Sequence, residues 1–303
     1  MESLQSRFVK IVLRLTRRKR MVRRVQELIE NGFESERLND KPSSKVYEKH
    51  LVSTREFRGQ TVWTIAPREK RSEKHILYLH GGGYVNGFAW LHWKFISNMV
   101  SELGCTVIAP DYPLTPENQV HDVFDMVFPL YQELLTKAGA ENLIVMGDSA
   151  GSGMGLALAM RARDEEIEQP SDIFLLSPWL DVTMTNTDAE KIDRFDPFLD
   201  IRGLKYLGKI YAGETDPTDY LVSPIYGSLK NLAPITLFIG THDMFVADCR
   251  KFKNKAEAEG IKIDYHEYER MVHVWMLMSL PEGEKAAKAI CAKIENKKAA
   301  ALS

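Results

Sequence analysis

The serine at position 149 lies in a setting that suits a nucleophile. It sits in Gly147-Asp148-Ser149-Ala150-Gly151, which fits the pattern G-x-S-x-G. Apolar residues 143–146 before it indicate a buried strand, and apolar residues from 154 to 160 indicate a buried helix. In such a turn the two glycines prevent a clash between strand and helix while the hydroxyl projects outward. The alternative is a tight turn that happens to contain a serine, because the five-residue pattern alone is common.

A serine hydroxyl is a weak nucleophile near neutral pH, so it needs a base, and the base needs an acceptor that orients it. In open parallel sheets such groups lie beyond the carboxyl ends of the strands. Asp243 follows the apolar run 234–239, and His273 follows a predicted strand at 261–268. We therefore expect Ser149, Asp243 and His273 to form a catalytic triad.

Other acids and histidines compete for these roles. Asp148 adjoins the serine, but its side chain should point away from the hydroxyl. Asp248 lies one helical turn beyond the favoured acid, and Asp181 follows a strand expected to adjoin the serine. Of the histidines, His80 is expected to support the neighbouring glycine loop. His242 is a competing base, although its direct sequence neighbour is poorly placed to accept its hydrogen bond.

A second stretch with chemical potential is His80-Gly81-Gly82-Gly83, directly after the apolar strand 75–79. Three consecutive glycines are costly to order, but they let backbone N–H groups point freely at a ligand. This is where an oxyanion site would be built from backbone amides. The alternative is a flexible loop.

The elements that must position these residues alternate along the chain. Strands are expected at 46–52, 61–65, 75–79, 105–109, 143–146, 171–176, 234–239 and 261–268. Helices are expected at 91–103, 120–137, 245–259 and 283–297. This alternation predicts an α/β fold with a mostly parallel sheet and helices on both faces. Residues 184–222 contain no clear strand and are expected to form a helical insertion.

The first 40 residues are expected to be helical and strongly basic. Apolar residues recur at helical spacing, and arginines and lysines fill much of the rest. We favour a helix that packs its apolar face on the body with its cations in solvent; contact with a membrane or nucleic acid is the alternative. The expected organisation is a cap from 1–40 and 184–222 over a catalytic core formed by 41–183 and 223–303.

Composition restricts the class of protein. With 303 residues and 44% hydrophobic content, the chain can bury a large core, and a net charge of −2 gives no general attraction to nucleic acid. The three cysteines are far apart and indicate neither a disulfide framework nor a zinc site. No apolar run approaches the roughly 20 residues of a membrane span, and no secretory signal is recognisable. We expect a cytoplasmic protein without metal or cofactor; a homodimer is left open.

The chain resembles the hormone-sensitive-lipase-like branch of the α/β-hydrolase esterases. The resemblance covers most of the chain from about residue 75 onward. The occurrence of the glycine run together with the G-x-S-x-G turn in one chain is a specific signal. Small departures affect loop detail only: Pro113 and Thr115 replace Arg and Ala of the family's Asp-Tyr-Arg-Leu-Ala-Pro-Glu, and Ser152 replaces a common glycine. The matching segments are His80–Gly83, Asp111-Tyr112 with Pro116-Glu117, Gly147–Gly151, Ser177–Asp181, Gly240–Asp243 and His273.

The resemblance implies an α/β-hydrolase fold with a helical cap, and it implies a role for each matching residue. Ser149 would attack the acyl carbonyl, His273 would transfer the proton, and Asp243 would orient the histidine. The implied oxyanion donors are the backbone N–H groups of Gly82, Gly83 and Ala150.

The implied activity is that of a serine carboxylesterase acting on small, short-acyl esters through an acyl-enzyme. A deacetylase or an amidase of the same mechanism is the alternative, and a non-catalytic receptor is disfavoured because all three triad members are present. The residues expected to line the substrate pocket, each of which would otherwise pack in the core, are Tyr84, Trp179, Met244 and Trp275.

Overall fold

The structure is a computed structural model that describes residues 2–16, 18–31, 39–69 and 72–301. Within these residues eight strands form one sheet in the order β1-β2-β4-β3-β5-β6-β7-β8. β2 pairs antiparallel with both of its neighbours, β1 and β4, and all other neighbouring strands are parallel. The strands are β1 His50–Phe57, β2 Gln60–Pro67, β3 His75–Leu79, β4 Thr106–Pro110, β5 Leu143–Asp148, β6 Asp172–Leu176, β7 Ile235–Gly240 and β8 Asp264–Tyr268.

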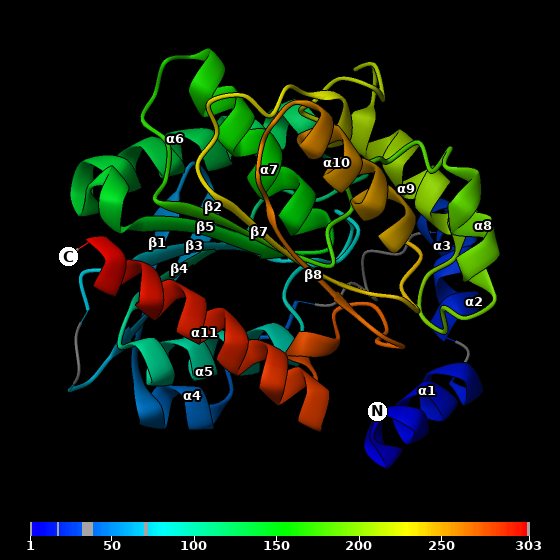
Figure 1. The fold of residues 1–303 in the computed structure, drawn as a ribbon, viewed down its shortest axis with the longest axis horizontal. Helices are drawn as coiled ribbons and strands as arrows, with labels where there is room; N and C mark the ends of the chain where they lie inside the picture. Colours follow the sequence, from blue (N-terminus) through cyan, green and yellow to red (C-terminus); the bar gives the residue numbers. More distant parts are fainter. Residues whose placement is uncertain (1, 17, 32–38, 70–71, 302–303) are drawn as a thin grey trace.

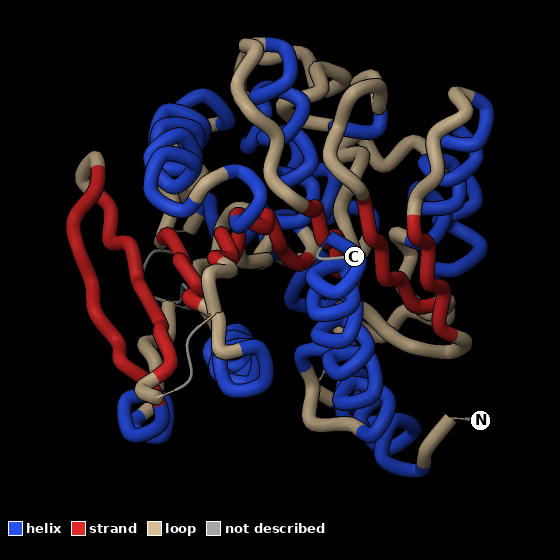
Figure 2. Tube along the Cα trace, turned by 60° about the vertical axis from the view of Figure 1, so that its left-hand side comes forward, coloured by secondary structure: helices blue, strands red, loops and turns tan. Residues whose placement is uncertain are grey.

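Helices cover both faces of the sheet (Figures 1 and 2). In Figure 1, α6, α7 and α10 lie on one face, and α4, α5 and α11 lie on the other. The helices are α1 Leu4–Leu15, α2 Arg18–Arg23, α3 Val25–Glu30, α4 Ser44–Lys49, α5 Trp90–Leu103, α6 Val120–Ala138, α7 Ala150–Asp164, α8 Thr187–Asp193, α9 Ile201–Ala212, α10 Val246–Ala258 and α11 Pro281–Ala301, with short 3₁₀ turns η2 Ala140–Asn142, η3 Pro224–Tyr226 and η4 Trp275–Leu277. The predicted α/β class and the mostly parallel sheet are confirmed.

The core is divided by the sheet because successive strand side chains point to opposite faces. In β3, Leu77 and Leu79 belong to the cluster under α6, α7 and α10, whereas Ile76 and Tyr78 belong to the cluster under α5 and α11. Both faces are therefore apolar. This explains why the central strands read as continuous apolar runs in the sequence.

The N-terminal helices pack on the insertion between β6 and β7. α2 and α3 both contact α9, and α8 and α9 are the helices of residues 184–222. A side chain at Gly203 would collide with the carbonyl of Val22, so this glycine allows the two backbones to approach closely. Two segments far apart in sequence thus form one helical layer (Figure 1).

The orientation of α1 is the reverse of the favoured prediction. Its apolar residues Leu4, Phe8, Ile11 and Leu15 are exposed, and its buried residues are Ser6 and Lys10. The prediction was wrong because helical spacing identifies an apolar stripe without identifying the surface that the stripe faces. Among the described residues, no helix is both long and apolar enough to cross a bilayer.

The segment after the polar linker was also assigned incorrectly in part. Residues 46–49 belong to the helix α4, and the strand begins only at His50. β-branched and aromatic residues favoured a strand, but that preference is weak and yields to tertiary packing. One helical turn buries Val46 in the cluster beneath α5. The region 1–40 that was expected to be helical includes residues 1, 17 and 32–38, which lie outside the described residues; in the described part its last helix, α3, ends at Glu30.

Candidate active site

Ser149 occupies the sharp turn between β5 and α7. Its φ of 52° lies in the left-handed region, which is strained for a residue with a side chain. Its N–H donates to the Leu176 carbonyl at 2.9 Å, and its own carbonyl accepts from the Trp179 N–H at 3.0 Å, so contacts around β6 maintain the strained turn. The hydroxyl of Ser152, where the family commonly has glycine, donates to the Gly147 carbonyl at 2.5 Å and accepts from the Leu176 N–H at 2.8 Å.

The two glycines of the serine turn are required by close backbone contacts. A Cβ on Gly147 would lie 2.6 Å from the carbonyl carbon of Gly151. A Cβ on Gly151 would collide with the carbonyl of Leu79, the residue that pairs with Gly147 in the parallel β3–β5 register. The crowding expected between strand and helix is present, and the neighbouring strand adds to it.

His273 lies between Ser149 and Asp243. Its Nε2 is 2.9 Å from the Ser149 Oγ, and its Nδ1 is 2.8 Å from Asp243 Oδ2. All three side chains are buried, and the serine retains 8% of its exposure. The three residues follow β5, β7 and β8, so they meet at the carboxyl edge of the parallel sheet.

Backbone contacts fix the separation between the acid and the histidine. The loop after β7 is tied to the loop after β8 by the His242 N–H, which donates to the Met271 carbonyl at 2.9 Å. A side chain at Gly240 would collide with that same carbonyl, so glycine allows the loops to approach. The loop after His273 is held in turn by the Val274 N–H, which donates to the Ser177 hydroxyl at 3.1 Å.

The hydrogen-bond partners determine the histidine tautomer. An ionised carboxylate only accepts hydrogen bonds, so the Nδ1 facing Asp243 carries the proton and the Nε2 facing Ser149 is an acceptor. Burial lowers the pKa of His273, but the charge and hydrogen bond of Asp243 outweigh burial and raise the pKa above its usual 6.5. The imidazolium is therefore stabilised at the position where a base must accept a proton.

The glycine loop lies beside the serine turn and is held by Asp148. Asp148 Oδ1 accepts from the Gly81 N–H at 3.0 Å and from the Tyr78 hydroxyl at 2.7 Å. Gly82 and Gly83 have φ values of +130° and +66°, conformations that favour glycine. Burial raises the pKa of Asp148, but His92 near its other oxygen and these hydrogen bonds lower it below the usual value. Asp148 points away from the serine hydroxyl, as expected, and supports the loop.

The other candidate acids are engaged elsewhere. Asp248 accepts from the Asn186 side chain at 2.9 Å, and burial raises its pKa to about 6. Asp181 accepts from the Thr183 hydroxyl and N–H. Neither contacts the histidine.

The other two candidate histidines are stacked on aromatic rings. His80 is stacked on Tyr112 with centroids 4.1 Å apart, and its Nδ1 lies 2.7 Å from the Gly81 carbonyl. Burial lowers the pKa of His80 to about 3, so the ring is neutral and supports the loop by packing. His242 is stacked on Phe195 with centroids 5.2 Å apart.

Sequence reasoning missed Asp196, a buried carboxylate from the insertion. Its Oδ1 accepts from the N–H groups of Phe198 and Leu199 at 2.7 and 2.9 Å, and its Oδ2 accepts from the Met244 N–H at 3.0 Å. Burial and the charge of Asp243 raise its pKa to about 6. Asp196 connects the insertion to the residue next to the candidate acid. Its only sequence signal is its place in Asp196-Pro197-Phe198, where an Asp before a turn commonly accepts backbone hydrogen bonds.

Three of the four residues predicted to line the pocket share one core cluster. Tyr84, Trp179 and Met244 lie in the cluster under α7 and α10, and the Tyr84 hydroxyl donates to the Ala150 carbonyl at 3.1 Å. Tyr84 is also stacked on Tyr211 of α9 with centroids 3.5 Å apart. Trp275 lies in the cluster on the other face of the sheet and does not join them.

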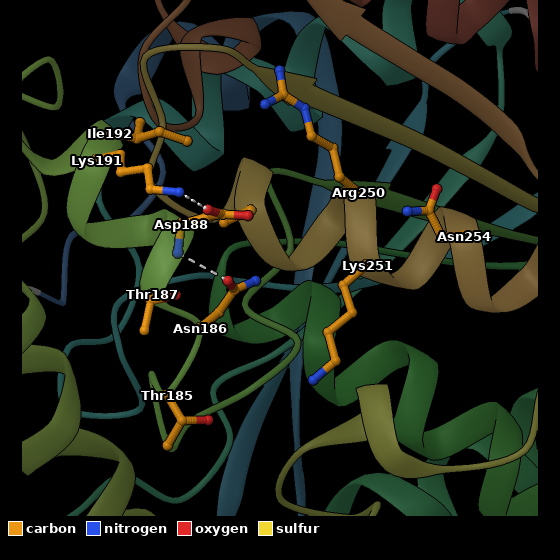
Figure 3. Close-up of a pocket in the computed structure, with 10 residues that line it drawn as sticks. Thr185, Asn186, Thr187, Asp188, Lys191, Ile192, Arg250, Lys251 and Asn254 are labelled. Carbon is orange, nitrogen blue, oxygen red and sulfur yellow. Dashed lines mark hydrogen bonds and ion pairs between the residues drawn. The ribbon is translucent and has the colours of Figure 1, made fainter.

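A cavity of about 730 Å³ lies between α8 and α10, away from the triad (Figure 3). It is lined by polar residues of both helices, and neither Ser149, Asp243 nor His273 is among them. Two of its cations are engaged with acids: Lys191 pairs with Asp188 and Arg250 with Glu267, each at 2.5 Å. This cavity therefore does not coincide with the candidate site.

Comparisons with known proteins agree with this geometry. Residues 76–277 match the family described as alpha/beta hydrolase fold. The chain is 30% identical over 215 residues to an esterase of Acinetobacter venetianus, covering 70% of this chain and 71% of that protein. It is 28% identical to an acetyl-hydrolase of Streptomyces hygroscopicus, covering 72% and 74%.

More distant and structural matches point the same way. The hormone-sensitive lipase of Homo sapiens is 26% identical over 199 residues, which cover 64% of this chain and 18% of that protein. The crystal structure of a putative esterase from Staphylococcus aureus superposes with a TM-score of 0.83 at 27% identity, covering 89% of this chain and 92% of that one.

Proposed function

This chain belongs to the α/β hydrolase fold family and is a carboxylic ester hydrolase similar to hormone-sensitive-lipase-like esterases, and we propose that Ser149, His273 and Asp243 are its catalytic triad. The observation that carries the proposal is the position of His273, whose two ring nitrogens lie 2.9 Å from the serine hydroxyl and 2.8 Å from the carboxylate. No other described acid or histidine makes this pair of contacts.

In this mechanism Ser149 Oγ attacks the acyl carbonyl while His273 Nε2 takes its proton. The imidazolium then gives that proton to the leaving alcohol, and the acyl group remains on the serine as an ester. Water activated by the neutral His273 hydrolyses this acyl-enzyme and restores the hydroxyl. Asp243 keeps the Nδ1 protonated and stabilises the imidazolium, which is consistent with the raised pKa of His273.

The oxyanion formed by the attack would be bound by the backbone N–H groups of Gly82, Gly83 and Ala150. Ala150 is the first residue of α7, so its N–H lies at a helix N-terminus, where backbone donors lack partners within the helix. The two glycines have backbone conformations that suit amides directed at a ligand. Their arrangement depends on Asp148, which holds Gly81 through its N–H.

The substrate class we propose is small esters with short acyl groups. Ser149 is largely covered, Phe198 of the insertion lies over the His273 ring with centroids 5.6 Å apart, and α9 stacks Tyr211 on Tyr84 beside the glycine loop. We infer from this aromatic packing around the serine that a short acyl group is accommodated better than a long one. An acetyl-hydrolase among the relatives supports the same class, and deacetylation of an acetylated alcohol uses the same steps.

The covering layer itself is proposed to be a cap formed by residues 1–40 and 184–222. The support is the packing of α2 and α3 on α9, together with the contacts of Phe198 and Asp196 near the triad. The remaining segments, 41–183 and 223–303, would form the catalytic core.

The test is a series of p-nitrophenyl esters of increasing acyl length, with organophosphate labelling followed by peptide mass spectrometry. We expect hydrolysis to be fastest for acetate and butyrate, and the label to be attached to Ser149. The substitution Ser149→Ala should abolish turnover and labelling without changing the melting curve. Activity that survives in this variant, or a label on another residue, would assign the nucleophile elsewhere.

A further inference from the structure

The helix α1 presents an apolar stripe to solvent. Leu4, Phe8, Ile11 and Leu15 are 80%, 66%, 51% and 75% exposed, and their spacing of three and four residues places them on one side of the helix. A surface helix normally turns such a stripe toward the core. Figure 1 shows α1 at the margin of the molecule, away from the sheet.

Polar contacts on the opposite side keep the stripe outward. The hydroxyls of Ser3 and Ser6 donate to Glu282 at 2.9 and 2.7 Å, which ties the start of α1 to α11. Lys10 is buried, pairs with Glu2 and donates to the Arg270 carbonyl at 3.4 Å. A rotation of α1 that buried the apolar stripe would break these contacts and would move Ser6 and Lys10 out of their buried positions. The outward orientation is therefore built into the fold.

The surroundings of the stripe are strongly basic. Residues 1–30 contain nine lysines and arginines against three glutamates, in a chain whose net charge is −2. A cleft of about 740 Å³ begins at Leu13 and Arg14 of α1 and continues along α2 and α3 to the insertion. Its acidic lining residues are Glu27, Asp193 and Asp196, and its more numerous cations are Arg14, Lys19, Arg20, Arg23, Arg24 and Arg194.

An exposed apolar stripe beside a cationic cleft is complementary to an anionic lipid surface. At twelve residues α1 is too short to span a bilayer, which needs about 20, but an amphipathic helix of this kind lies in the interface with its apolar side chains among the acyl chains. A two-fold pairing with a second copy would bring one basic surface against another, and their repulsion opposes it. A soluble anion would leave the apolar stripe exposed.

We propose that α1 and the adjoining basic cleft are a docking surface for an anionic lipid bilayer. Within the cleft Lys19 pairs with Asp193, Arg23 with Asp200 and Arg24 with Glu27. Leu4, Phe8, Ile11 and Leu15 enter the interface, and the other cations of the cleft, Arg14, Arg20 and Arg194, contact the headgroups. Attachment is peripheral and reversible, because a single short helix buries little apolar area and part of the attraction is screened by salt. The inference does not depend on the triad.

The test is sedimentation of the full chain with two kinds of vesicle at low and high salt. One kind is phosphatidylcholine alone, and the other contains roughly one third phosphatidylglycerol. We expect binding to the anionic vesicles at low salt, with the bound fraction falling as salt rises. Joint replacement Phe8→Gln and Leu15→Gln should lower the partition coefficient about tenfold or more, since both side chains lose their insertion. Circular dichroism melting of this variant confirms that it is folded.

The matched control is Leu51→Gln on β1, since Leu51 is 44% exposed but lies outside the docking surface. This variant should bind anionic vesicles like the parent. Failure of the folded parent to bind anionic vesicles at low salt would overturn the proposal, as would equal binding by the double variant. Analytical ultracentrifugation without lipid tests the alternative, in which a second copy of the chain covers the apolar stripe. If the parent is a dimer, the double variant is a monomer and neither binds vesicles, the surface is a dimer interface and the bilayer proposal is wrong.

Discussion

Replacement of Asp243 by asparagine tests the proposed triad through the tautomer of His273. Asp243 uses one carboxylate oxygen to accept from the Phe245 N–H at 3.0 Å and the other to face His273 Nδ1 at 2.8 Å. In Asp243→Asn the amide oxygen should keep the bond to the Phe245 N–H, because an NH₂ group there would face another donor. The NH₂ group is then directed at Nδ1 and forces the ring proton onto Nε2. A protonated Nε2 cannot accept the proton of Ser149, 2.9 Å away.

The expected magnitude follows from the loss of the base. A triad histidine held in the wrong tautomer lowers kcat by about 10⁴-fold, which corresponds to about 5 kcal/mol of barrier. The assay is steady-state hydrolysis of p-nitrophenyl acetate at pH 8, with kcat and KM determined separately. We expect kcat to fall and KM to change little, because the substitution affects proton transfer and leaves the binding surfaces in place.

Asp248→Asn is the matched control for this experiment. It makes the same change at another buried acid, one helical turn along the chain, and its Asn186 contact can persist through the amide oxygen. This variant should retain activity within a few-fold of the parent. If Asp243→Asn keeps most of the parental kcat, or if Asp248→Asn loses as much, the assignment of the acid and the tautomer argument are both wrong.

Further predictions concern pH and stability. Because Asp243 raises the pKa of His273, the acid limb of kcat/KM should lie above pH 6.5, and a limb below that value would contradict the geometry. The charge of Asp196 also raises the pKa of His273, so Asp196→Asn should move the acid limb of kcat/KM to lower pH. An acid limb at the parental pH would show that the charge of Asp196 does not act on His273. Burial raises the pKa of Asp248 to about 6, so the folded state binds this proton more tightly than the unfolded chain and stability falls as pH rises from 3.8 to about 6. Asp248→Asn should therefore be more stable than the parent at pH 8, by about 1–3 kcal/mol, with no gain at pH 4, as urea denaturation would measure. Gly151→Ala forces a Cβ against the Leu79 carbonyl and should cost about 3 kcal/mol or more of unfolding free energy; a variant with the parental denaturation midpoint would refute the crowding argument.

Local sequence was enough to predict the serine turn because its requirements are local. Gly147 and Gly151 are needed wherever a strand turns sharply into a helix around a serine, and the apolar runs on both sides identify those elements. Asp243 and His273 became candidates because polar residues after parallel strands must meet at one sheet edge. In the structure the two side chains contact each other, and His273 also contacts the Ser149 hydroxyl.

Residues that act through tertiary contacts were not predicted. Asp196 lies in an irregular stretch between α8 and α9, and nothing in its neighbourhood indicates that its carboxylate reaches the Met244 N–H. Trp275 follows His273 by two residues, yet it packs on the opposite face of the sheet from Tyr84 and Trp179. Proximity in sequence to a site residue did not determine the direction of its side chain.

The amino-acid sequence by itself determined the alternation of strands and helices, the serine turn and the order of the polar residues along the sheet edge, because each depends on periodicity or on the sterics of a few neighbours. The tertiary structure decided which surface of each element faces the core. In α1, Leu13 packs against the core cluster under α5 and α11, so α1 has an apolar contact with the body besides its exposed stripe, and hydrophobic spacing did not settle the orientation. The hydrogen bonds to Glu282 and the ion pair of buried Lys10 with Glu2 settled it. A buried ionised group must keep its partners, whereas an apolar stripe can remain in solvent at a smaller cost.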